Sequence, residues 1–470
     1  MDCLKAIGSK ARLLLKDLNR RHFQWTGSLG FRRQTRLFNW GMQMNAFTER
    51  HMNLMNHNFD IIVVGGGPAG STAGYKLGQS GARVLLLDKA TFPREKPCGG
   101  GLSARILDRF PYVREFLQCG EVPVNPVSRV HLEAPDGTRI TYQQVKPLLY
   151  LVRRVEFDAA LFRRAQSVCT VQTGVTIRKC TVVPTHVEIE DTIGRTYAAP
   201  MIIGADSANS VIARHTGLRS EAARKEYAVD MMEETTYNRL QVVDRDAVYI
   251  FLTLTQSFGY GYIFPKTDHL NLGFGCKLDW YFRALRGKGR EHHAEWVDTL
   301  KQKGDVTGES DRDSYRAFPI PVCGPLAKTY TDRVLLAGDA GGFVNAFTAE
   351  GIFYAMTSGS IAADTAIVAI KAQKYNARVL SQYEQQWKSE IGDDLMRSVE
   401  IQQRFFNDSG RRLDWLVQNA ASDPELLKLI VDFSTGATEY DKLQSYMMRS
   451  TVPKWVWGKV KAASGLFSQN

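Results

Sequence analysis

The pattern of apolar and polar positions predicts strands and helices that alternate along the chain. Short apolar runs at Ile61–Val64 and Val84–Leu87 have the length and continuity of buried parallel strands. A helix-compatible segment joins them, which predicts a βαβ unit. Two more apolar runs, at 201–204 and 334–337, lead into Gly-x-Asp and Gly-Asp turns. We expect all four runs to be strands of one domain.

Other segments alternate apolar and polar residues, as half-buried antiparallel strands do. These segments are 128–145, 168–203 and 247–278. Asp136-Gly137 predicts a hairpin turn in the first segment, and Asp191 and Gly194 mark a turn in the second. Helical patterns cover 152–167, 280–303, 350–372 and most of the remaining C-terminal region. Because strand-rich segments separate the parallel-strand units, we expect an α/β fold with an inserted, mostly antiparallel sheet domain.

Glycines follow the first apolar run at once. Gly65, Gly67 and Gly70 have GxGxxG spacing, in which the first permits a tight turn and the second lets backbone approach a pyrophosphate. The third lets helix and strand pack closely. Asp88 ends the second strand 23 residues after Gly65, near the spacing of an acid that binds the adenosine ribose. Together these features predict a dinucleotide site; a glycine-rich turn without a ligand is the alternative.

Composition and charge narrow the class of protein. The 470 residues suffice for two or three domains, and 44% hydrophobic and 23% charged residues are ordinary for a soluble globular protein. Residues 1–58 hold ten Lys and Arg against three Asp and Glu, so the other 412 residues carry only +4 of the net +11. This near balance argues against a nucleic-acid enzyme. No run approaches the roughly 18 apolar residues that span a bilayer, so we expect any membrane contact to be peripheral.

The basic segment 1–58 has no clear core pattern. Residues 3–20 have the spacing of a short basic amphipathic helix. Three interpretations remain open: an organelle transit peptide, a membrane-surface helix, or an upstream start choice, with Met52 or Met55 as the natural start. The segment is therefore left out of the fold prediction.

The seven cysteines are scattered, odd in number and form no CxxC pair. This pattern excludes an obvious zinc site or disulfide framework and fits a reducing compartment. We expect no metal and a cytoplasmic location. Contact with a membrane surface, or organelle targeting by residues 1–58, remains open.

Five motifs recur in one order along the chain. They are Gly65-Gly-Gly-Pro-Ala-Gly70, Phe92-Pro-Arg-Glu-Lys-Pro-Cys-Gly-Gly-Gly-Leu102, Gly204-Ala-Asp-Ser-Ala-Asn-Ser210, Tyr260-Gly-Tyr-Ile-Phe-Pro265 with Gly273-Phe-Gly275, and Gly338-Asp-Ala-Gly-Gly-Phe-Val-Asn-Ala-Phe-Thr-Ala-Glu-Gly351. In this order they resemble the FAD-dependent geranylgeranyl reductases of archaea and bacteria, within the aromatic-hydroxylase-like superfamily of FAD flavoproteins. The resemblance covers roughly residues 59–440. The second and fourth motifs distinguish this family from other FAD enzymes, because the other three motifs are common to many FAD enzymes.

The resemblance implies a Rossmann-like FAD-binding domain, an inserted antiparallel-sheet substrate domain and C-terminal helices. The expected parts are the basic extension, 1–58; the FAD-binding domain, 59–127, 150–215 and 330–375; the substrate-binding sheet domain, 128–149 and 216–329; and the C-terminal helical region, 376–470.

The same resemblance implies FAD as the cofactor. Asp339, at the end of a strand, can accept hydrogen bonds from ribityl hydroxyls or cap a helix. A helix that starts near Glu350-Gly351 can direct its N-terminus at the flavin. Cys98 is implied to lie beside the isoalloxazine as the candidate catalytic residue; a small packing residue is the alternative. The expected cofactor-binding residues are Gly65, Gly67, Pro68, Ala69, Gly70, Asp88, Lys89, Arg94, Cys98, Gly99, Gly100, Arg154, Asp206, Gly338, Asp339, Gly351 and Ile352.

The aromatic strand of the fourth motif is implied to floor a tunnel that holds an isoprenoid chain. Its aromatic side chains alternate along the strand and are expected to share one face; an ordinary aromatic core is the alternative. The glycines after it would leave room for the chain or the flavin ring. The expected substrate-binding residues are Tyr260, Tyr262, Phe264, Pro265, Gly273 and Gly275. Lys266 is a candidate for an anionic headgroup, with a solvated lysine as the alternative.

Three departures from the family pattern stand out. Tyr262 replaces the usual Trp, which keeps an aromatic ring but reshapes the tunnel. Ser207 replaces the last glycine of Gly-Ala-Asp-Gly and puts contact with a nicotinamide in doubt. Ala346 and Ala349 replace a proline and a glycine in the loop near the flavin.

The leading functional hypothesis is an FAD-dependent oxidoreductase that reduces carbon–carbon double bonds of an isoprenoid or prenylated lipid. A flavin-dependent monooxygenase or halogenase on the same scaffold is the alternative, and a flavin-binding electron carrier is a third class. The expected electron donor is NAD(P)H or reduced ferredoxin. The exact substrate, the proton donor and the oligomeric state do not follow from the sequence.

Overall fold

The structure, a computed structural model, describes residues 58–220, 226–252, 259–406, 411–436, 442–443 and 445–446. The basic extension expected at 1–58 lies outside the described residues, apart from Asn58. The described residues from Asn58 onward belong to one compact unit. The proposed boundary between the cofactor and substrate domains stays a prediction.

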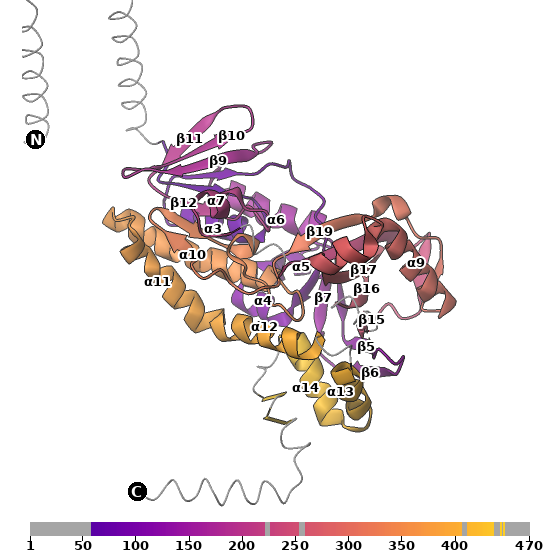
Figure 1. The fold of residues 1–470 in the computed structure, drawn as a ribbon. Helices are drawn as coiled ribbons and strands as arrows, with labels where there is room; N and C mark the ends of the chain where they lie inside the picture. The colour runs from indigo at the N-terminus through magenta and orange to yellow at the C-terminus, as the bar shows by residue number, and fades with distance from the viewer. Residues whose placement is uncertain are drawn as a thin grey trace, which may run out of the picture. The chain divides into compact units, whose positions relative to one another are not determined.

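A six-stranded sheet forms the centre of the segments expected to bind the cofactor (Figure 1). In spatial order its strands are β20 (Tyr330–Thr331), β21 (Val334–Leu336), β12 (Ile202–Gly204), β1 (Ile61–Val64), β2 (Val84–Leu87) and β8 (Thr170–Gln172). All neighbouring pairs are parallel except β20 with β21. Every residue of β1 and β2 is buried, because helices or strands cover both faces of a central parallel strand. The expected parallel strands are therefore confirmed.

Helices α3 (Pro68–Gln79), α6 (Arg154–Gln166) and α10 (Ile352–Ala372) pack together beside this sheet. A Cβ on Gly359 of α10 would lie 2.2 Å from the carbonyl oxygen of Ala69 in α3, so the close crossing of the two helices requires glycine there. Among the described residues, α10 alone is long and apolar enough to cross a membrane by length and composition. Of its most apolar window, 83% is buried inside the protein.

A second, seven-stranded sheet is built from residues of the expected substrate domain. In spatial order its strands are β19 (Arg316–Ile320), β13 (Ala228–Thr236), β17 (His269–Lys277), β16 (Gly261–Pro265), β15 (Ala247–Phe251), β5 (Arg129–Glu133) and β6 (Arg139–Gln143). Only β5 with β15 is a parallel pair. The predicted hairpin at Asp136-Gly137 joins β5 to β6, with Gly137 at φ +87°. The α/β class with an inserted antiparallel sheet is confirmed.

Three small sheets complete the strands of the described region. They are β9 (Ile177–Val182), β10 (Val187–Asp191) and β11 (Thr196–Ala199); β3 (Gly101–Ser103), β7 (Leu149–Val152) and β4 (Val124–Val127); and β14 (Leu240–Val242) with β18 (Val306–Gly308). The first of these confirms the strand-rich section expected at 168–203. Its turn between β10 and β11 contains Gly194, as predicted.

The helix predicted at 280–303 is interrupted. The segment contains α8 (Leu278–Trp280), a π-helical turn (Tyr281–Leu285) and α9 (Gly289–Gln302). Arg286 and Gly287 both have positive φ, at +48° and +87°, and a right-handed helix cannot continue through two such residues. Shorter helices elsewhere are α4 (Ala104–Arg109), α5 (Pro111–Gln118) and α7 (Val211–His215). Short 3₁₀ turns lie at Arg312–Ser314 and Gly338–Gly341.

The C-terminal helices reach back to the second sheet. They are α11 (Ala377–Trp387), a π-helical turn (Lys388–Gly392), α12 (Asp393–Phe406), α13 (Arg411–Ser422) and α14 (Pro424–Ser434). The last two lie beside the β5–β6 hairpin (Figure 1). Apolar residues of α12, α13 and α14 form one cluster with Leu132 of β5 and Ile140 of β6. The helical C-terminal region thus supplies one wall of the space in front of the second sheet.

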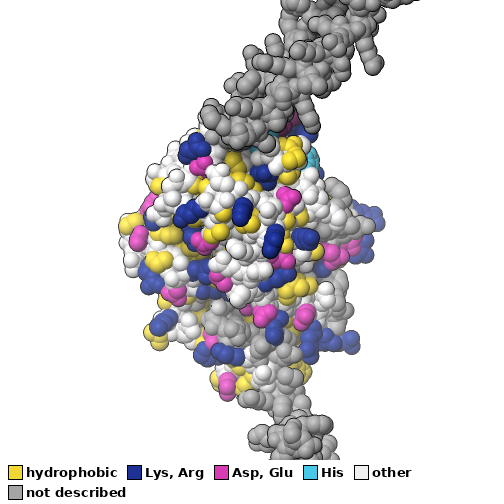
Figure 2. Space-filling model, turned by 90° about the vertical axis from the view of Figure 1, so that its left-hand side faces the viewer, with side chains coloured by type: hydrophobic (Ala, Val, Ile, Leu, Met, Phe, Trp, Pro, Cys, Tyr) yellow, Lys and Arg dark blue, Asp and Glu magenta, His cyan; other side chains and the backbone are white. Residues whose placement is uncertain are grey.

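The surface fits the balanced charge expected outside residues 1–58. On the face in Figure 2, Lys and Arg side chains are interspersed with Asp and Glu. A single extended basic patch, of the kind that binds nucleic acid, is not seen among the described residues of this face.

Candidate active site

One cavity of about 740 Å³ brings most of the predicted site residues together. The predicted cofactor residues that line it are Gly65, Gly67, Pro68, Ala69, Asp88, Lys89, Arg94, Cys98, Gly99, Gly100, Arg154, Asp206, Gly338, Asp339, Gly351 and Ile352. Tyr260, Tyr262, Phe264 and Gly275 of the predicted substrate residues also line it. Gly70, Pro265 and Gly273 do not.

The glycine motif forms the turn between β1 and α3. Gly65 has φ +106°, and a Cβ there would lie 2.2 Å from the carbonyl oxygen of Ala205. Gly70 does not line the cavity but is required for close packing, because a Cβ added at this position would lie 1.7 Å from the carbonyl oxygen of Gly65. Helix α3 begins after Gly67, with Pro68 at its first position. The N–H groups of a first helical turn have no partner within the helix, so this end of α3 suits an anion.

The Asp88 carboxylate is oriented by the backbone around it. Its Oδ2 accepts a hydrogen bond from the N–H of Gly66 at 2.6 Å, and Oδ1 accepts one from Ala90 at 2.7 Å. Each oxygen keeps a further lone pair, and the side chain lines the cavity. Asp88 can therefore accept hydrogen bonds from ribose hydroxyls without giving up its own contacts.

Arg94 carries an unpaired donor into the same part of the cavity. Its Nη2 lies 2.9 Å from Oδ2 of Asp158 and 3.5 Å from the position that a Cβ on Gly67 would take. Its Nη1 is buried, and none of the described residues pairs with it. A buried donor without a partner is costly, and the pyrophosphate of FAD would supply one beside the end of α3. The residues present at this end therefore fit FAD.

A second arginine shares the Asp158 carboxylate. Nε and Nη2 of Arg154 donate to its two oxygens at 2.7 and 2.8 Å, and both side chains are buried. The Arg154 guanidinium also interacts with the thiol of Cys98. This buried group therefore connects α6 to the loop that carries Cys98.

The Cys98-Gly99-Gly100 loop packs directly on the aromatic strand. A Cβ on Gly99 would lie 2.9 Å from the ring of Phe264 and 3.3 Å from that of Tyr262. The N–H of Gly100 lies 3.4 Å from Sγ of Cys98, and Gly100 itself has φ +73°. The loop thus needs glycine to bring Cys98 and the aromatic strand to one wall.

The aromatic side chains share one face, as expected. The ring centroids of Tyr260 and Tyr262 are 6.5 Å apart, and those of Tyr262 and Phe264 are 4.8 Å apart. Two of the predicted substrate residues, Pro265 and Gly273, do not line the cavity. Pro265 follows Phe264 directly, so strand alternation turns it to the other face of β16, away from the cavity. Gly273 gives room to the ring of Tyr262 itself, whose Oη would lie 2.3 Å from a Cβ at that position.

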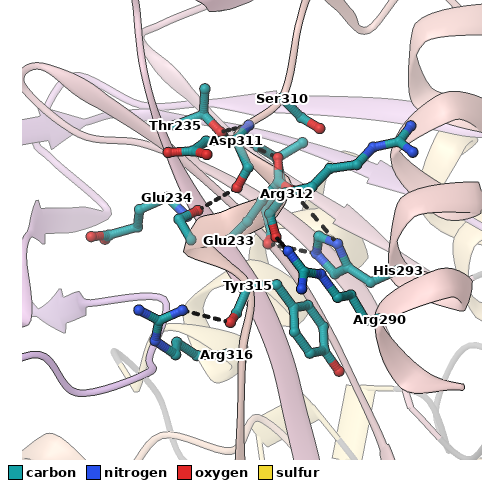
Figure 3. Close-up of polar contacts among 12 residues, drawn as sticks. Glu233, Glu234, Thr235, Arg290, His293, Ser310, Asp311, Arg312, Tyr315 and Arg316 are labelled. Carbon is teal, nitrogen blue, oxygen red and sulfur yellow. Dashed lines mark hydrogen bonds and ion pairs between the residues drawn. The ribbon is translucent and has the colours of Figure 1, made fainter.

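Lys266 is not a solvated lysine, and its role towards an anionic headgroup stays a prediction. Its side chain is buried and paired with Glu234. Glu234 also pairs with Arg153 at 3.3 Å. Figure 3 shows that the neighbouring residues Glu233 and Glu234 point in different directions. Glu233 points towards His293, and Glu234 points away from it. The alternation of β13 thus separates a polar group at α9 from the residues on the cavity side.

Lys96 and Asp230 are ionisable residues of the cavity wall that are not among the predicted site residues. Lys96 lines the cavity with its Nζ 2.9 Å from the ring centroid of Phe318. Burial lowers the pKa of Lys96 to about 7; the Asp339 carboxylate opposes this shift and the Arg154 guanidinium adds to it. Asp230 of β13 faces the cavity beside Tyr262, and burial raises its pKa to about 6. The sequence signal for Asp230 was a lone carboxyl within the apolar start of a strand.

The loops after β12 and β21 carry the second half of the expected flavin site. Ser207 stands at φ +69°, and its hydroxyl lies 3.4 Å from Oδ2 of Asp339. Ala349 has φ +57°. Glu350, just before α10, accepts a hydrogen bond from Ser103 at 2.7 Å and pairs with Arg105. Two positions where the family has glycine therefore keep a left-handed backbone while carrying a side chain.

Beyond the aromatic strand the cavity is mostly apolar, with Gln402, Ser434 and Thr435 among the polar side chains that line it. Side chains of β5 and β15 line one side of it, and side chains of the C-terminal helices line the other. They are Val130, Leu132, Val248, Ile250, Leu252, Phe347, Phe405, Phe406, Leu413, Leu416, Val417, Ile430, Val431 and Phe433. A polar glycine-motif end and a long apolar end thus belong to one cavity.

Comparisons with known proteins agree with this geometry. Residues 58–391 match the model of the FAD binding domain family. The chain is 29% identical over 382 residues to a digeranylgeranylglycerophospholipid reductase of Methanocaldococcus jannaschii, covering 78% of this chain and 92% of the relative. It is 26% identical over 410 residues to digeranylgeranylglycerophospholipid reductase 1 of Methanococcoides burtonii, covering 84% and 95%.

Solved structures show the same fold. A geranylgeranyl bacteriochlorophyll reductase-like protein of Thermoplasma acidophilum superposes with a TM-score of 0.68 at 23% identity, covering 78% of this chain and 92% of that one. A flavin-dependent brominase superposes with a TM-score of 0.61 at 16% identity, covering 80% and 93%. Because the family model spans well over half of the sequence, the chain belongs to the FAD-binding domain family and is an FAD-dependent oxidoreductase related to the geranylgeranyl reductases.

Proposed function

We propose that this protein saturates carbon–carbon double bonds in the isoprenoid chains of a prenylated lipid. One observation carries the proposal: a single cavity is lined by the glycine motif and also by the aromatic strand and apolar side chains of the C-terminal helices. A site for a dinucleotide is thereby joined to a site for a long hydrocarbon.

The cofactor contacts follow from the cavity. Arg94 and the N-terminus of α3 bind the pyrophosphate, Asp88 the adenosine ribose and Asp339 the ribityl hydroxyls. Lys96 adds a positive charge near Asp339 when it is protonated. Bound FAD, when reduced, supplies a hydride to one carbon of an alkene.

The remaining residues of the cavity position the alkene and keep water away from it. An isolated alkene is a poor hydride acceptor, so its reduction depends on a fixed approach and a dry site. Tyr260, Tyr262 and Phe264 provide a continuous aromatic wall. The loop that contains Cys98 packs closely against this wall at Gly99. The apolar side chains of α12, α13 and α14 hold the rest of the hydrocarbon.

The substrate class rests on two supports. The archaeal relatives are reductases of digeranylgeranylglycerophospholipid, and the apolar end of the cavity offers a hydrocarbon chain a long continuous lining. A monooxygenase or halogenase is the alternative, since the brominase shares the fold. An aromatic substrate of that class would leave most of the apolar space unfilled.

An anaerobic assay tests the proposal. The FAD-loaded protein is reduced with dithionite and mixed with digeranylgeranylglycerophospholipid or with geranylgeranyl diphosphate. The masses of the lipid products are then measured by mass spectrometry. We expect a gain of two hydrogens for each reduced double bond, without oxygen. Product formed only in air supports a monooxygenase, and no product from either prenyl substrate refutes the proposal. Replacing dithionite by NADPH, NADH or reduced ferredoxin identifies the electron donor.

A further inference from the structure

Asp230 is a carboxyl group set into the wall of the cavity. It lies on β13, is 6% exposed and lines the cavity. Its cross-strand neighbours are Gly275 on one side and Phe318 on the other. Since Gly275 has no side chain, it leaves the face of Asp230 open towards the ring of Tyr262.

Tyr262 holds this carboxyl group. Its Oη lies 3.2 Å from Oδ1 and 3.3 Å from Oδ2 of Asp230. The rest of the Tyr262 ring is fixed between Gly273, Phe264 and the Cys98 loop. The Tyr262 side chain therefore has little freedom to move, and its hydroxyl is held within hydrogen-bond distance of Asp230.

No Lys, Arg or His of the described residues forms an ion pair with Asp230. The nearest cations act from a greater distance, and one of them, Lys266, is already paired with Glu234. The titratable groups that interact electrostatically with Asp230 are Lys96, Tyr260, Tyr262, Lys266, Cys276 and Tyr315. A buried carboxyl group without a salt bridge favours its neutral, protonated form.

We propose that Asp230 is the catalytic acid that protonates the alkene, and that Tyr262 is the positioning residue that orients its carboxyl group. This inference rests on the proposed function and names the proton donor of the same site. It assigns to a residue of the sheet a role that the sequence left open.

The step balances as follows in atoms and electrons. The O–H bond of the Asp230 carboxyl breaks, a C–H bond forms at one alkene carbon and the π bond between the two carbons is lost. The other carbon takes the hydride, so the alkene gains two electrons that come from reduced FAD. Asp230 is left as a carboxylate and regains a proton from solvent before the next turnover.

The replacement of tryptophan by Tyr262 fits this role. An indole N–H only donates, so it can contact the carboxylate but not the proton of the acid. A phenol hydroxyl donates to the carboxylate and accepts from the protonated acid. Tyr262 therefore keeps Asp230 in one orientation through both states of the cycle.

Single-turnover kinetics test the proposal on the FAD-loaded full chain. The variants Asp230→Asn, Tyr262→Phe and Cys98→Ser are reduced with dithionite, and the oxidation of their flavin by digeranylgeranylglycerophospholipid is followed without oxygen. We expect the Asp230→Asn rate to fall by about 10²- to 10⁴-fold, the usual contribution of a general acid. The exposed Asp279→Asn variant should match the wild type. FAD content and the rate of reduction by dithionite should stay unchanged in Asp230→Asn, Tyr262→Phe and Asp279→Asn.

Two further readouts separate the roles. With no substrate present, the infrared difference between wild type and Asp230→Asn should show the band of a protonated carboxyl that titrates near pH 6. Taking the difference removes the band of Glu233, whose pKa burial raises to about 7 in both proteins. Tyr262→Phe should move the Asp230 titration and lower kcat while leaving KM unchanged, and Tyr262→Trp should restore kcat only in part. These results would show that Tyr262 positions the carboxyl group of Asp230, because a loss of packing alone would not produce them.

The proposal is overturned if Asp230→Asn reduces the alkene at the wild-type rate, and equally if Cys98→Ser alone abolishes proton transfer while Asp230→Asn does not. In both cases the proposed function survives, because the wild type still forms product. If the wild type reduces neither prenyl substrate, the proposed function fails first, and the role of Asp230 fails with it.

Discussion

The hydroxyl of Ser207 lies 3.4 Å from Oδ2 of Asp339, and Ser207 makes this contact from a left-handed backbone at φ +69°. The family has glycine at this turn, where positive φ carries no steric cost. Ser207 thus keeps the glycine conformation at a cost and partly offsets that cost with a hydrogen bond to the predicted ribityl ligand.

Substitutions at Ser207 should separate strain from hydrogen bonding. Ser207→Ala keeps the strained backbone and loses the hydrogen bond, so we expect it to lower stability by about 0.5–1.5 kcal/mol. Ser207→Gly also loses the bond but relieves about 1–2 kcal/mol of left-handed strain, less about 0.5–1 kcal/mol for the entropy cost of glycine, so it should be more stable than Ser207→Ala. Urea unfolding measures both. A Gly variant less stable than the Ala variant would contradict this account.

Ala349 poses the same test without a hydrogen bond. It has φ +57° in the loop before α10, so Ala349→Gly should raise stability by up to about 1 kcal/mol, the left-handed strain less the entropy cost of glycine. Ala363→Gly, inside helix α10, is the matched control and should lower stability by about 1 kcal/mol or more. Thermal unfolding of both variants checks the opposite signs, and a loss of stability at both positions would show that Ala349 is unstrained.

Arg94 should account for much of the affinity for FAD. Arg94→Ala removes the buried Nη1 that has no partner among the described residues, and leaves Asp158 paired with Arg154. A charge-assisted hydrogen bond contributes about 1.5–3 kcal/mol, so the Kd for FAD should rise about 10- to 100-fold. Titration of the apoprotein by flavin fluorescence measures it. Arg114→Ala, an exposed arginine paired with Asp108, is the control, and equal Kd values for both variants would remove Arg94 from the site.

Local patterns in the sequence were enough to predict much of this fold. The apolar runs of β1, β2, β12 and β21, and the Asp136-Gly137 hairpin, follow from period and turn chemistry alone. The break at Arg286 and Gly287 was missed, because the helical pattern on both sides is continuous and arginine rarely adopts positive φ.

The parts of the site that escaped prediction depend on contacts between distant strands. Gly273 was assigned to the substrate, but its register partner is Tyr262, whose ring fills the space. Asp230 becomes a site residue only because β13 lies beside β17, opposite Gly275. The hydrophobic periodicity and the motifs identify which residues face one side of a strand. The register between neighbouring strands determines which side chains each of these residues contacts.

The polar group on the far side of β13 should make stability depend on pH. Burial raises the pKa of Glu233 to about 7, and its Oε2 lies 3.8 Å from Nδ1 of His293 (Figure 3). Between pH 4.5 and 7 the folded protein holds a proton that the unfolded chain releases. The stability from Glu233 is therefore present below pH 4.5 and is lost as pH rises through 7.

Glu233→Gln should remove this loss. The variant's free energy of unfolding, relative to wild type, should rise by up to about 3 kcal/mol between pH 4.5 and 8, since one pKa unit is worth 1.36 kcal/mol. Burial lowers the pKa of His293 to about 4 in both proteins, so its effect below pH 6.5 largely cancels in the comparison. Urea unfolding across this range is the measurement. A difference that stays constant with pH, as expected for the exposed control Glu309→Gln, would show that Glu233 is ionised in the fold.

The apolar end of the cavity should set the length of chain that the protein accepts. Val417 of α13 is fully buried and lines that end. Val417→Phe adds a ring where the hydrocarbon would lie, so activity on a geranylgeranyl chain should fall by about tenfold or more relative to a geranyl chain. Asn419→Phe adds the same ring on the exposed side of the same helix and should leave the ratio unchanged. The ratio of kcat/KM for the two chains is the measurement, because a general loss of folded protein lowers both values equally. If Val417→Phe lowers both by the same factor, the chain does not reach α13, and the substrate must occupy only the part of the cavity beside the aromatic strand.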